Sequence, residues 1–158
     1  MAENIKLSNY LNDSLIFIDQ IVQSSDQLFE MVSHRGLQLG YVREDFLERV
    51  KEREATFPTG IQLSTLGVAI PHTDAECILK EFVAIVISPT PITFKSMEDL
   101  NQTVAASVVF VLGLNRPHAQ LEMLQSLMSL IQNDDILNQL INVKSNEELI
   151  TIVKTNKF

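Results

Sequence analysis

The run from Ala105 to Leu112 constrains the fold most, because it is β-prone and apolar at every position except Ser107. A strand buried under layers on both faces has this pattern, whereas a strand with one wet face alternates between apolar and polar residues. No apolar run in the chain approaches the ~20 residues that a membrane-spanning helix needs. We therefore expect a central, fully buried strand and no direct insertion into a membrane.

Short strands and helices are interleaved along the rest of the chain, which predicts an α/β fold with a mixed β-sheet flanked by helices. No linker, internal repeat or low-complexity block divides residues 1–158, so we expect a single domain. Strands are expected at 15–18, 67–70, 82–87 and 105–112, with a short edge strand at 92–94, and helices near 24–39, 43–54, 117–131, 133–141 and 145–153.

Proline and glycine mark the expected boundaries of these elements. Pro89 and Pro91 should close the strand at 82–87, because proline cannot donate to a sheet. Residues 58–60, with the sequence Pro-Thr-Gly, should form a turn.

Glycine is also expected to end the first helix, at either Gly36 or Gly40. Pro117 suits the first position of the long third helix. Apolar residues recur at helical spacing after it, and we assign them to the core: Leu121, Leu124, Leu127, Met128 and Ile131.

Composition excludes several classes of function. The formal net charge of −8 argues against binding of nucleic acid or anionic lipid through general electrostatics. The one cysteine, Cys77, allows neither an internal disulfide nor a cysteine-based zinc site, and we interpret it as a small apolar filler. Residues 1–7 lack the cationic and apolar regions of a signal peptide. We therefore expect a cytoplasmic protein.

The stretch from Gly67 to His72 carries the strongest candidate for chemistry. Its small apolar run should stop at Pro71, which has no N–H and a fixed φ. His72 then follows at the end of a strand, where a rigid scaffold holds it in place. Such a position suits a reactive imidazole, although a lone histidine at a strand end is more often a surface or capping residue.

Three further side chains could form an anion site with His72, and each also has an ordinary structural role. Arg53, at the end of the second helix, is either a solvated cation near the helix C-terminus or a clamp for phosphate oxygens. His118 and Gln120 are either simple polar residues of a first helical turn or donors to an anion there. His34 is expected on a solvated helix face, and we assign it no function.

Together these residues are compatible with a phosphohistidine site. A neutral imidazole is nucleophilic, and a phosphorylated one needs an arginine and hydrogen-bond donors around its oxygens. The chain has no Walker loop, kinase glycine loop or nucleotide fingerprint, so ATP is not expected as the phosphate source. A carrier that receives phosphate from another protein needs no cofactor and no built-in metal site.

Two stretches resemble the enzyme IIA component of bacterial sugar phosphotransferase systems, in the fructose–mannitol family. They are residues 53–61, Arg-Glu-Ala-Thr-Phe-Pro-Thr-Gly-Ile, and residues 67–74, Gly-Val-Ala-Ile-Pro-His-Thr-Asp. The turn at 57–60 and the sequence His-Thr-Asp at 72–74 are most similar to the galactitol-type branch. The resemblance extends from about Leu15 to Val153.

The resemblance implies a mannitol-type IIA fold and a phosphotransferase role for His72. The histidine would accept phosphate from the carrier protein HPr and pass it to a cysteine of the cognate IIB component. IIB then phosphorylates a sugar, here a galactitol-like polyol, that enters through the membrane component IIC. Arg53 matches the family's phosphate-binding arginine. Gln120 occupies the position at which many members carry a second histidine, and His118 lies two residues before it.

Two other functions stay open. The same fold serves as a regulatory module in nitrogen-related relatives, which bind target proteins according to their phosphorylation state. A hydrolase with His72 as its base is the weaker alternative, because no convincing serine or cysteine nucleophile accompanies it. For the carrier, we expect one exposed apolar patch around His72 to bind both protein partners in turn.

Overall fold

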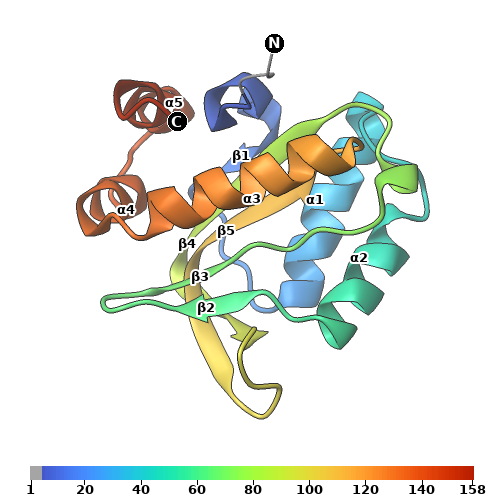
Figure 1. The fold of residues 1–158 in the computed structure, drawn as a ribbon, viewed down its shortest axis with the longest axis horizontal. Coiled ribbons are helices and arrows are strands. Elements are labelled where there is room, and N and C mark those ends of the chain that lie inside the picture. Colours follow the sequence, from blue (N-terminus) through green and yellow to red (C-terminus); the bar gives the residue numbers. More distant parts are fainter. Residues whose placement is uncertain (1–4) are drawn as a thin grey trace.

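A five-stranded mixed sheet forms the centre of the computed structural model, which describes residues 5–158 (Figure 1). Two of its strand pairs are antiparallel and two are parallel, so the predicted α/β fold with a mixed sheet is confirmed. In sheet order the strands are β1 (Ile16–Phe17), β4 (Phe82–Lys95), β5 (Thr103–Gly113), β3 (Gly67–Ala69) and β2 (Gly60–Gln62).

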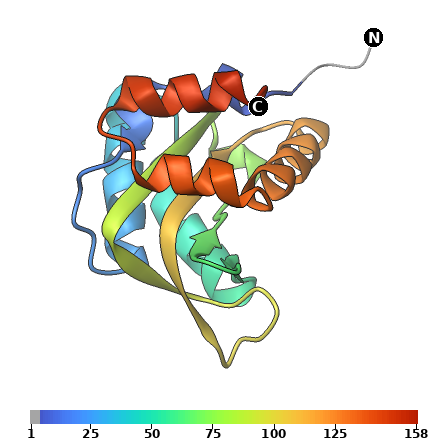
Figure 2. The ribbon, with the colours of Figure 1, turned by 90° about the vertical axis from the view of Figure 1, so that its left-hand side faces the viewer.

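Helices cover both faces of this sheet (Figures 1 and 2). One face is covered by α1 (Ser25–Leu39) and α2 (Phe46–Thr56), and the other by α3 (Pro117–Ile131), α4 (Asp134–Ile141) and α5 (Asn146–Thr155). Short 3-10 turns lie at Leu7–Tyr10, Asp13–Leu15 and Ala75–Cys77. Within residues 5–158, no helix combines the length and the apolar character that crossing a bilayer requires.

The central strand β5 contributes to the hydrophobic clusters on both sides of the sheet. Val108 and Phe110 pack under α3, whereas Val109 and Val111 pack against the cluster of α1 and α2. All four side chains are fully buried, which confirms the expected central strand. Burial on both faces holds only for this C-terminal part, because Ala105 near the start of β5 is exposed.

Strand β4 is longer than predicted, and its two prolines do not end it. The pairing of β4 with β5 shifts register between Ile87 and Ile92 and then continues to Lys95. Pro89 and Pro91 lie in this irregular stretch, where the missing proline N–H groups break no ladder bond. The expected edge strand at 92–94 is therefore the continuation of β4.

Gly60 begins the strand β2, which the sequence analysis missed by assigning this residue to a turn. A Cβ atom at Gly60 would lie 2.5 Å from the backbone oxygen of Lys95, so only glycine allows β2 to approach the end of β4 so closely. The Gly60 oxygen accepts a hydrogen bond from the Met97 N–H at 2.8 Å. This contact brings the β4–β5 hairpin loop beside residues 58–59.

The helix boundaries follow from capping groups. Ser24 accepts a hydrogen bond from the Gln27 N–H at 3.1 Å and so begins α1. Gly40, with φ of 76°, ends the same helix, whereas Gly36 is buried inside it. The second helix begins at Phe46, three residues later than predicted.

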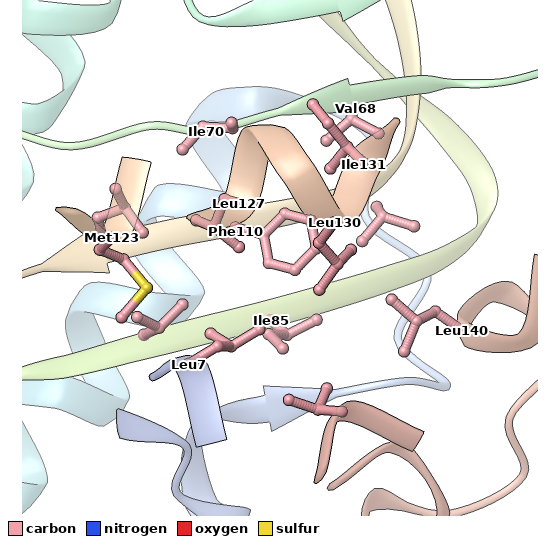
Figure 3. Close-up of a cluster of buried hydrophobic side chains, with 14 of the residues drawn as sticks. Leu7, Val68, Ile70, Ile85, Phe110, Met123, Leu127, Leu130, Ile131 and Leu140 are labelled. Atoms are coloured by element: carbon pink, nitrogen blue, oxygen red, sulfur yellow. The ribbon is translucent and has the colours of Figure 1, made fainter. Parts of the chain in front are cut away.

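The buried face of α3 differs from the predicted stripe of leucine and methionine residues. Figure 3 shows Met123, Leu127 and Leu130 in one buried cluster with Phe110 and Ile85 of the sheet. By contrast, the assignment of two further residues to the core was wrong, because 54% of Leu121 and 36% of Met128 are exposed. The core-facing stripe is narrower than the apolar pattern, because a sheet contacts only one side of a helix.

We predict that two alanine substitutions on α3 have very different costs. Leu127→Ala removes a fully buried side chain and should lower the free energy of unfolding by about 2–5 kcal/mol. Leu121→Ala, in which the same atoms are removed from an exposed position, should change it by no more than ~0.5 kcal/mol. Urea unfolding followed by circular dichroism measures both values, and equal losses would contradict the observed helix orientation.

Candidate active site

The backbone from Ile70 to His72 continues β3 beside β5 without forming a regular strand. Pro71 cannot donate a hydrogen bond, but its oxygen accepts one from the Leu112 N–H at 2.9 Å. His72 and Leu112 are paired in a parallel bridge. The regular strand ends at Ala69, one residue earlier than expected, and the Pro71 carbonyl keeps His72 fixed against the central strand.

The His72 side chain is half-buried and is held by its own backbone. Its Nδ1 atom lies 3.0 Å from the oxygen of Ile70. A carbonyl oxygen can only accept, so Nδ1 carries the proton, and in the neutral ring Nε2 keeps its lone pair.

Burial lowers the pKa of His72 below 6.5, and the charge of Arg53 lowers the pKa further, although the bond to Ile70 opposes both effects. The imidazole is therefore neutral near pH 7.

A buried carboxyl group, that of Glu54, is connected to the backbone beside His72 by hydrogen bonds. Glu54 is 9% exposed, and its two oxygens accept hydrogen bonds from the N–H and the hydroxyl of Thr59, both at 2.6 Å. The Thr59 hydroxyl in turn accepts from the Ile70 N–H at 3.2 Å. Burial raises the pKa of Glu54 to about 7, more than the two bonds from Thr59 lower it. A continuous hydrogen-bonded chain thus connects Glu54 with the residue that holds His72.

Arg53 lies in the last turn of α2 with an exposed side chain. Its guanidinium carbon is 4.9 Å from the centre of the Phe57 ring, a cation–π contact at the mouth of the site. Arg53 and His72 line the same cavity, so the structure brings these two predicted residues together. Both partners of this aromatic contact are exposed, so the guanidinium keeps its access to solvent.

The cavity that contains His72 has a volume of about 570 Å³. The last turn of α2, residues 57–59 and the hairpin loop at 97–101 form its other walls. Figure 1 shows this loop extending beyond the rest of the sheet. The rim of the cavity includes three exposed apolar side chains, Phe57, Met97 and Leu100. The expected apolar patch beside His72 is therefore present.

An ion-pair network holds the segment that follows His72. Arg49, one turn before Arg53, contacts Asp45 at 3.0 Å and Asp74 at 3.1 Å. Exposed pairs of this kind contribute little to stability. Their effect is to fix the segment after His72 against α2.

Gln120 and His118 do not line the cavity that His72 and Arg53 share. His118 is 77% exposed at its side chain and contacts Glu122, four residues further along α3, at 2.8 Å. The Gln120 side chain is half-buried, and its amide oxygen is buried without a hydrogen-bond partner in the described part of the chain. Of the two residues, Gln120 is therefore the one with an unpaired side-chain acceptor, its amide oxygen.

The other candidate residues fall where the sequence places them. His34 is exposed on α1. Cys77 is fully buried, with its sulfur 3.1 Å from the oxygen of Asp74. Within residues 5–158, no group of three or more His, Cys, Asp or Glu side chains is arranged to hold a metal ion.

Glu54 and Thr59 are the site residues that the sequence analysis missed. Glu54 is four residues after Val50 and eight after Phe46, and these three form the buried face of α2. That spacing was the available signal, because a glutamate at a core position needs buried hydrogen-bond partners. Thr59, in contrast, lies outside any helix or strand, so no periodicity marks it.

Residues 9–156 match the family described as phosphoenolpyruvate-dependent sugar phosphotransferase system, EIIA 2, and the chain belongs to this family. It is 32% identical over 117 residues to the galactitol-specific EIIA component of the Escherichia coli K12 phosphotransferase system. That alignment covers 72% of this chain and 77% of the relative. The expected family is therefore confirmed.

Two solved structures share the fold. The nitrogen regulatory protein IIA-Ntr from Neisseria meningitidis has a TM-score of 0.78 and 26% identity, over 92% of this chain and 97% of that chain. Enzyme IIAMTL from Escherichia coli, solved in complex with phosphorylated enzyme IIBMTL, has a TM-score of 0.73 and 20% identity over the same shares. The mannitol-type IIA fold expected from the sequence is confirmed.

We predict that Glu54 makes the stability of the protein depend on pH. The folded carboxyl group has a pKa of about 7, and the unfolded one an ordinary pKa near 4.5. Between these values the folded state retains a proton that the unfolded state has lost, so stability falls as pH rises through this window. The full loss amounts to about 3 kcal/mol, at ~1.4 kcal/mol per pKa unit.

Glu54→Gln should remove this dependence, because glutamine does not titrate. Urea midpoints at pH 5 and pH 8 give the change in stability for each variant, and groups common to both variants cancel in the comparison. Glu44→Gln, at an exposed position, serves as the matched control and should keep the wild-type difference. A Glu54→Gln protein with the wild-type difference would contradict the prediction.

Proposed function

We propose that this protein is the phosphocarrier of a sugar-uptake phosphotransferase system, with His72 as the residue that carries the phosphoryl group. The supporting observation is the geometry of His72: Nδ1 is committed to the Ile70 oxygen, which leaves Nε2 as the nucleophile in a cavity that also contains Arg53. Membership of the EIIA 2 family supports the same reaction class.

In the proposed reaction, the Nε2 lone pair attacks the phosphorus of phospho-HPr. The new N–P bond forms as the N–P bond of the donor histidine breaks, and the electron pair of that bond stays on HPr. A cysteine thiolate of the cognate IIB component then attacks the same phosphorus, an S–P bond forms, and the electron pair returns to Nε2. No proton leaves Nδ1 in either step, so the Ile70 oxygen can stabilise the ring, which is positive while Nε2 carries the phosphoryl group.

Two features of the cavity support a relay between proteins. The exposed apolar side chains Phe57, Met97 and Leu100 provide a small contact area beside His72. A small interface suits a carrier that must release each partner quickly. Arg53 would meet the phosphoryl oxygens and supply fixed positive charge, because phosphoryl transfer depends mainly on positioning and electrostatics.

The galactitol-specific relative supports a galactitol-like polyol as the sugar, which the membrane component IIC would admit. We place the carrier in the cytoplasm, where the free thiol of Cys77 would stay reduced.

The second candidate function is regulation. The likeness to the protein named nitrogen regulatory protein IIA-Ntr favours a module that binds target proteins according to the phosphorylation of His72. Both functions need a phosphohistidine, but only the carrier passes the group onward. Transfer of label from the phosphorylated protein to a IIB cysteine would decide for the carrier, and a phosphorylated protein that gives IIB no label would decide against it.

We predict that His72→Ala abolishes labelling of the protein by radioactive phosphoenolpyruvate with enzyme I and HPr. The substitution removes the proposed nucleophile but leaves the backbone bond between Pro71 and Leu112 in place. Circular dichroism should therefore show an unchanged fold. His34→Ala, on the exposed face of α1, is the control and should be labelled as well as the wild type. Label that persists on His72→Ala would refute the assignment.

We also predict that Arg53→Lys slows transfer from phospho-HPr. Lysine keeps the charge but lacks the planar fork that binds two phosphate oxygens. Loss of such a transition-state donor should cost roughly 2–4 kcal/mol, or about thirty- to a thousandfold in rate. Thermal stability should barely change, because Arg53 is exposed. Rapid-quench measurement of the transfer rate tests this.

The same assay compares Gln120→Ala with His118→Ala. We expect only Gln120→Ala to be slow, because Gln120 occupies the position of the family's second histidine and its amide NH2 group can donate, whereas His118 is exposed and paired with Glu122. If only His118→Ala is slow, the family's second histidine corresponds to His118. If neither is slow, α3 does not contribute through these two side chains.

A further inference from the structure

A buried chain of hydrogen bonds connects Glu54 with the residue that holds His72. It runs from the last turn of α2 through Thr59 to Ile70, and its links measure 2.6, 2.6 and 3.2 Å. Glu54, Thr59 and Ile70 are 9%, 4% and 1% exposed, so water does not compete for these bonds. Buried polar groups that leave their bonds unmade cost free energy, which makes this chain hard to rearrange.

Each hydrogen bond in the chain has only one possible direction while Glu54 is ionised. The Ile70 N–H can only donate, so the Thr59 hydroxyl is the acceptor at that end. The hydroxyl proton is then available for Glu54, whose carboxylate oxygen can only accept. Thr59 thus transmits the position of the carboxylate to the backbone of Ile70.

Ile70 is fixed from both sides by these contacts. Its N–H is bound by Thr59, and the next carbonyl group, that of Pro71, is bound by the Leu112 N–H. Because Pro71 has no N–H, the peptide between Ile70 and Pro71 offers only the Ile70 oxygen. That oxygen points at His72 Nδ1, at 3.0 Å. Thr59 thus holds the N–H of the residue whose oxygen binds the imidazole.

We propose that Thr59, held by Glu54, is a positioning residue that keeps the His72 imidazole in the tautomer with a proton on Nδ1 and a free lone pair on Nε2. This inference rests on the proposed function only for its kinetic consequence. The Thr59 hydroxyl is engaged by Glu54 and by the Ile70 N–H rather than by the imidazole. It acts through Ile70, in the same way that outer hydrogen-bond partners orient a metal-binding histidine.

The test compares Thr59→Val with Thr59→Ser. Valine matches the shape of threonine but lacks the hydroxyl group, whereas serine keeps it. Long-range ¹H–¹⁵N NMR of unphosphorylated His72 reports directly which ring nitrogen carries the proton. Wild type and Thr59→Ser should show the Nδ1-protonated tautomer alone, and Thr59→Val should show a mixture of both tautomers.

Transfer kinetics provide the second measurement. Thr59→Val should lower kcat for transfer from phospho-HPr about ten- to a hundredfold, the usual effect of losing an outer partner of a reactive group. The KM for phospho-HPr should stay within twofold, because the exposed rim of the cavity is unchanged. Thr151→Val, which removes a hydroxyl that bonds Glu147 on an exposed face of α5, is the control and should match wild type in both measurements.

A wild-type tautomer spectrum in Thr59→Val would overturn the proposal whatever its transfer rate. If Thr59→Val does not fold, Glu54→Gln replaces it, because the amide offers Thr59 one acceptor where the carboxylate offers two. A mixed tautomer in that variant supports the proposal, and a wild-type spectrum overturns it. A changed tautomer in a protein whose wild type accepts no phosphate would support the positioning role while refuting the proposed function.

Discussion

Pro71 lacks the N–H group that another residue could donate to the central strand, but the rest of the pairing continues. The arrangement of the site depends on this single missing donor. The Pro71 carbonyl still bonds the Leu112 N–H, so the backbone keeps its place beside β5. The neighbouring polar groups of Ile70 leave the sheet, and one binds Thr59 while the other binds the His72 ring. A residue with an N–H at position 71 would add a donor that needs its own partner. The proline thus frees Ile70 to hold the imidazole.

Arg53 and Glu54 show how one helical turn serves two purposes. They are adjacent in sequence, but a helix rotates by about 100° per residue, so their side chains leave α2 in different directions. Arg53 is exposed at the cavity, and Glu54 is buried behind it. The positive charge therefore stays available to an anion, while the carboxyl group organises the interior. Burial of each side chain disfavours its charged form. It therefore raises the pKa of Glu54, which is charged when deprotonated, and lowers the pKa of His72, which is charged when protonated.

The length of β4 determines what surrounds the histidine. The irregular stretch at 88–91 lets the strand pass its two prolines and continue to Lys95. The hairpin loop that follows then reaches Gly60, and residues 97–101 become a wall of the cavity. Without this extension, Met97 and Leu100 would not lie near Phe57. The exposed apolar surface beside His72 is thus assembled from the hairpin loop and from the end of α2.

The sequence alone determined the layered α/β architecture, the buried strand β5, the place of His72 just after a strand and that of Arg53 at the end of a helix. These follow from local patterns, because apolar runs, capping residues and proline act within a few positions of the chain. Only the tertiary structure decided which face of α3 is buried, that Gly60 begins a strand, and that Glu54 and Thr59 support His72. Those outcomes depend on contacts between segments far apart in sequence, such as the Thr59 hydroxyl with the Ile70 N–H, and no periodicity in the sequence records such a contact.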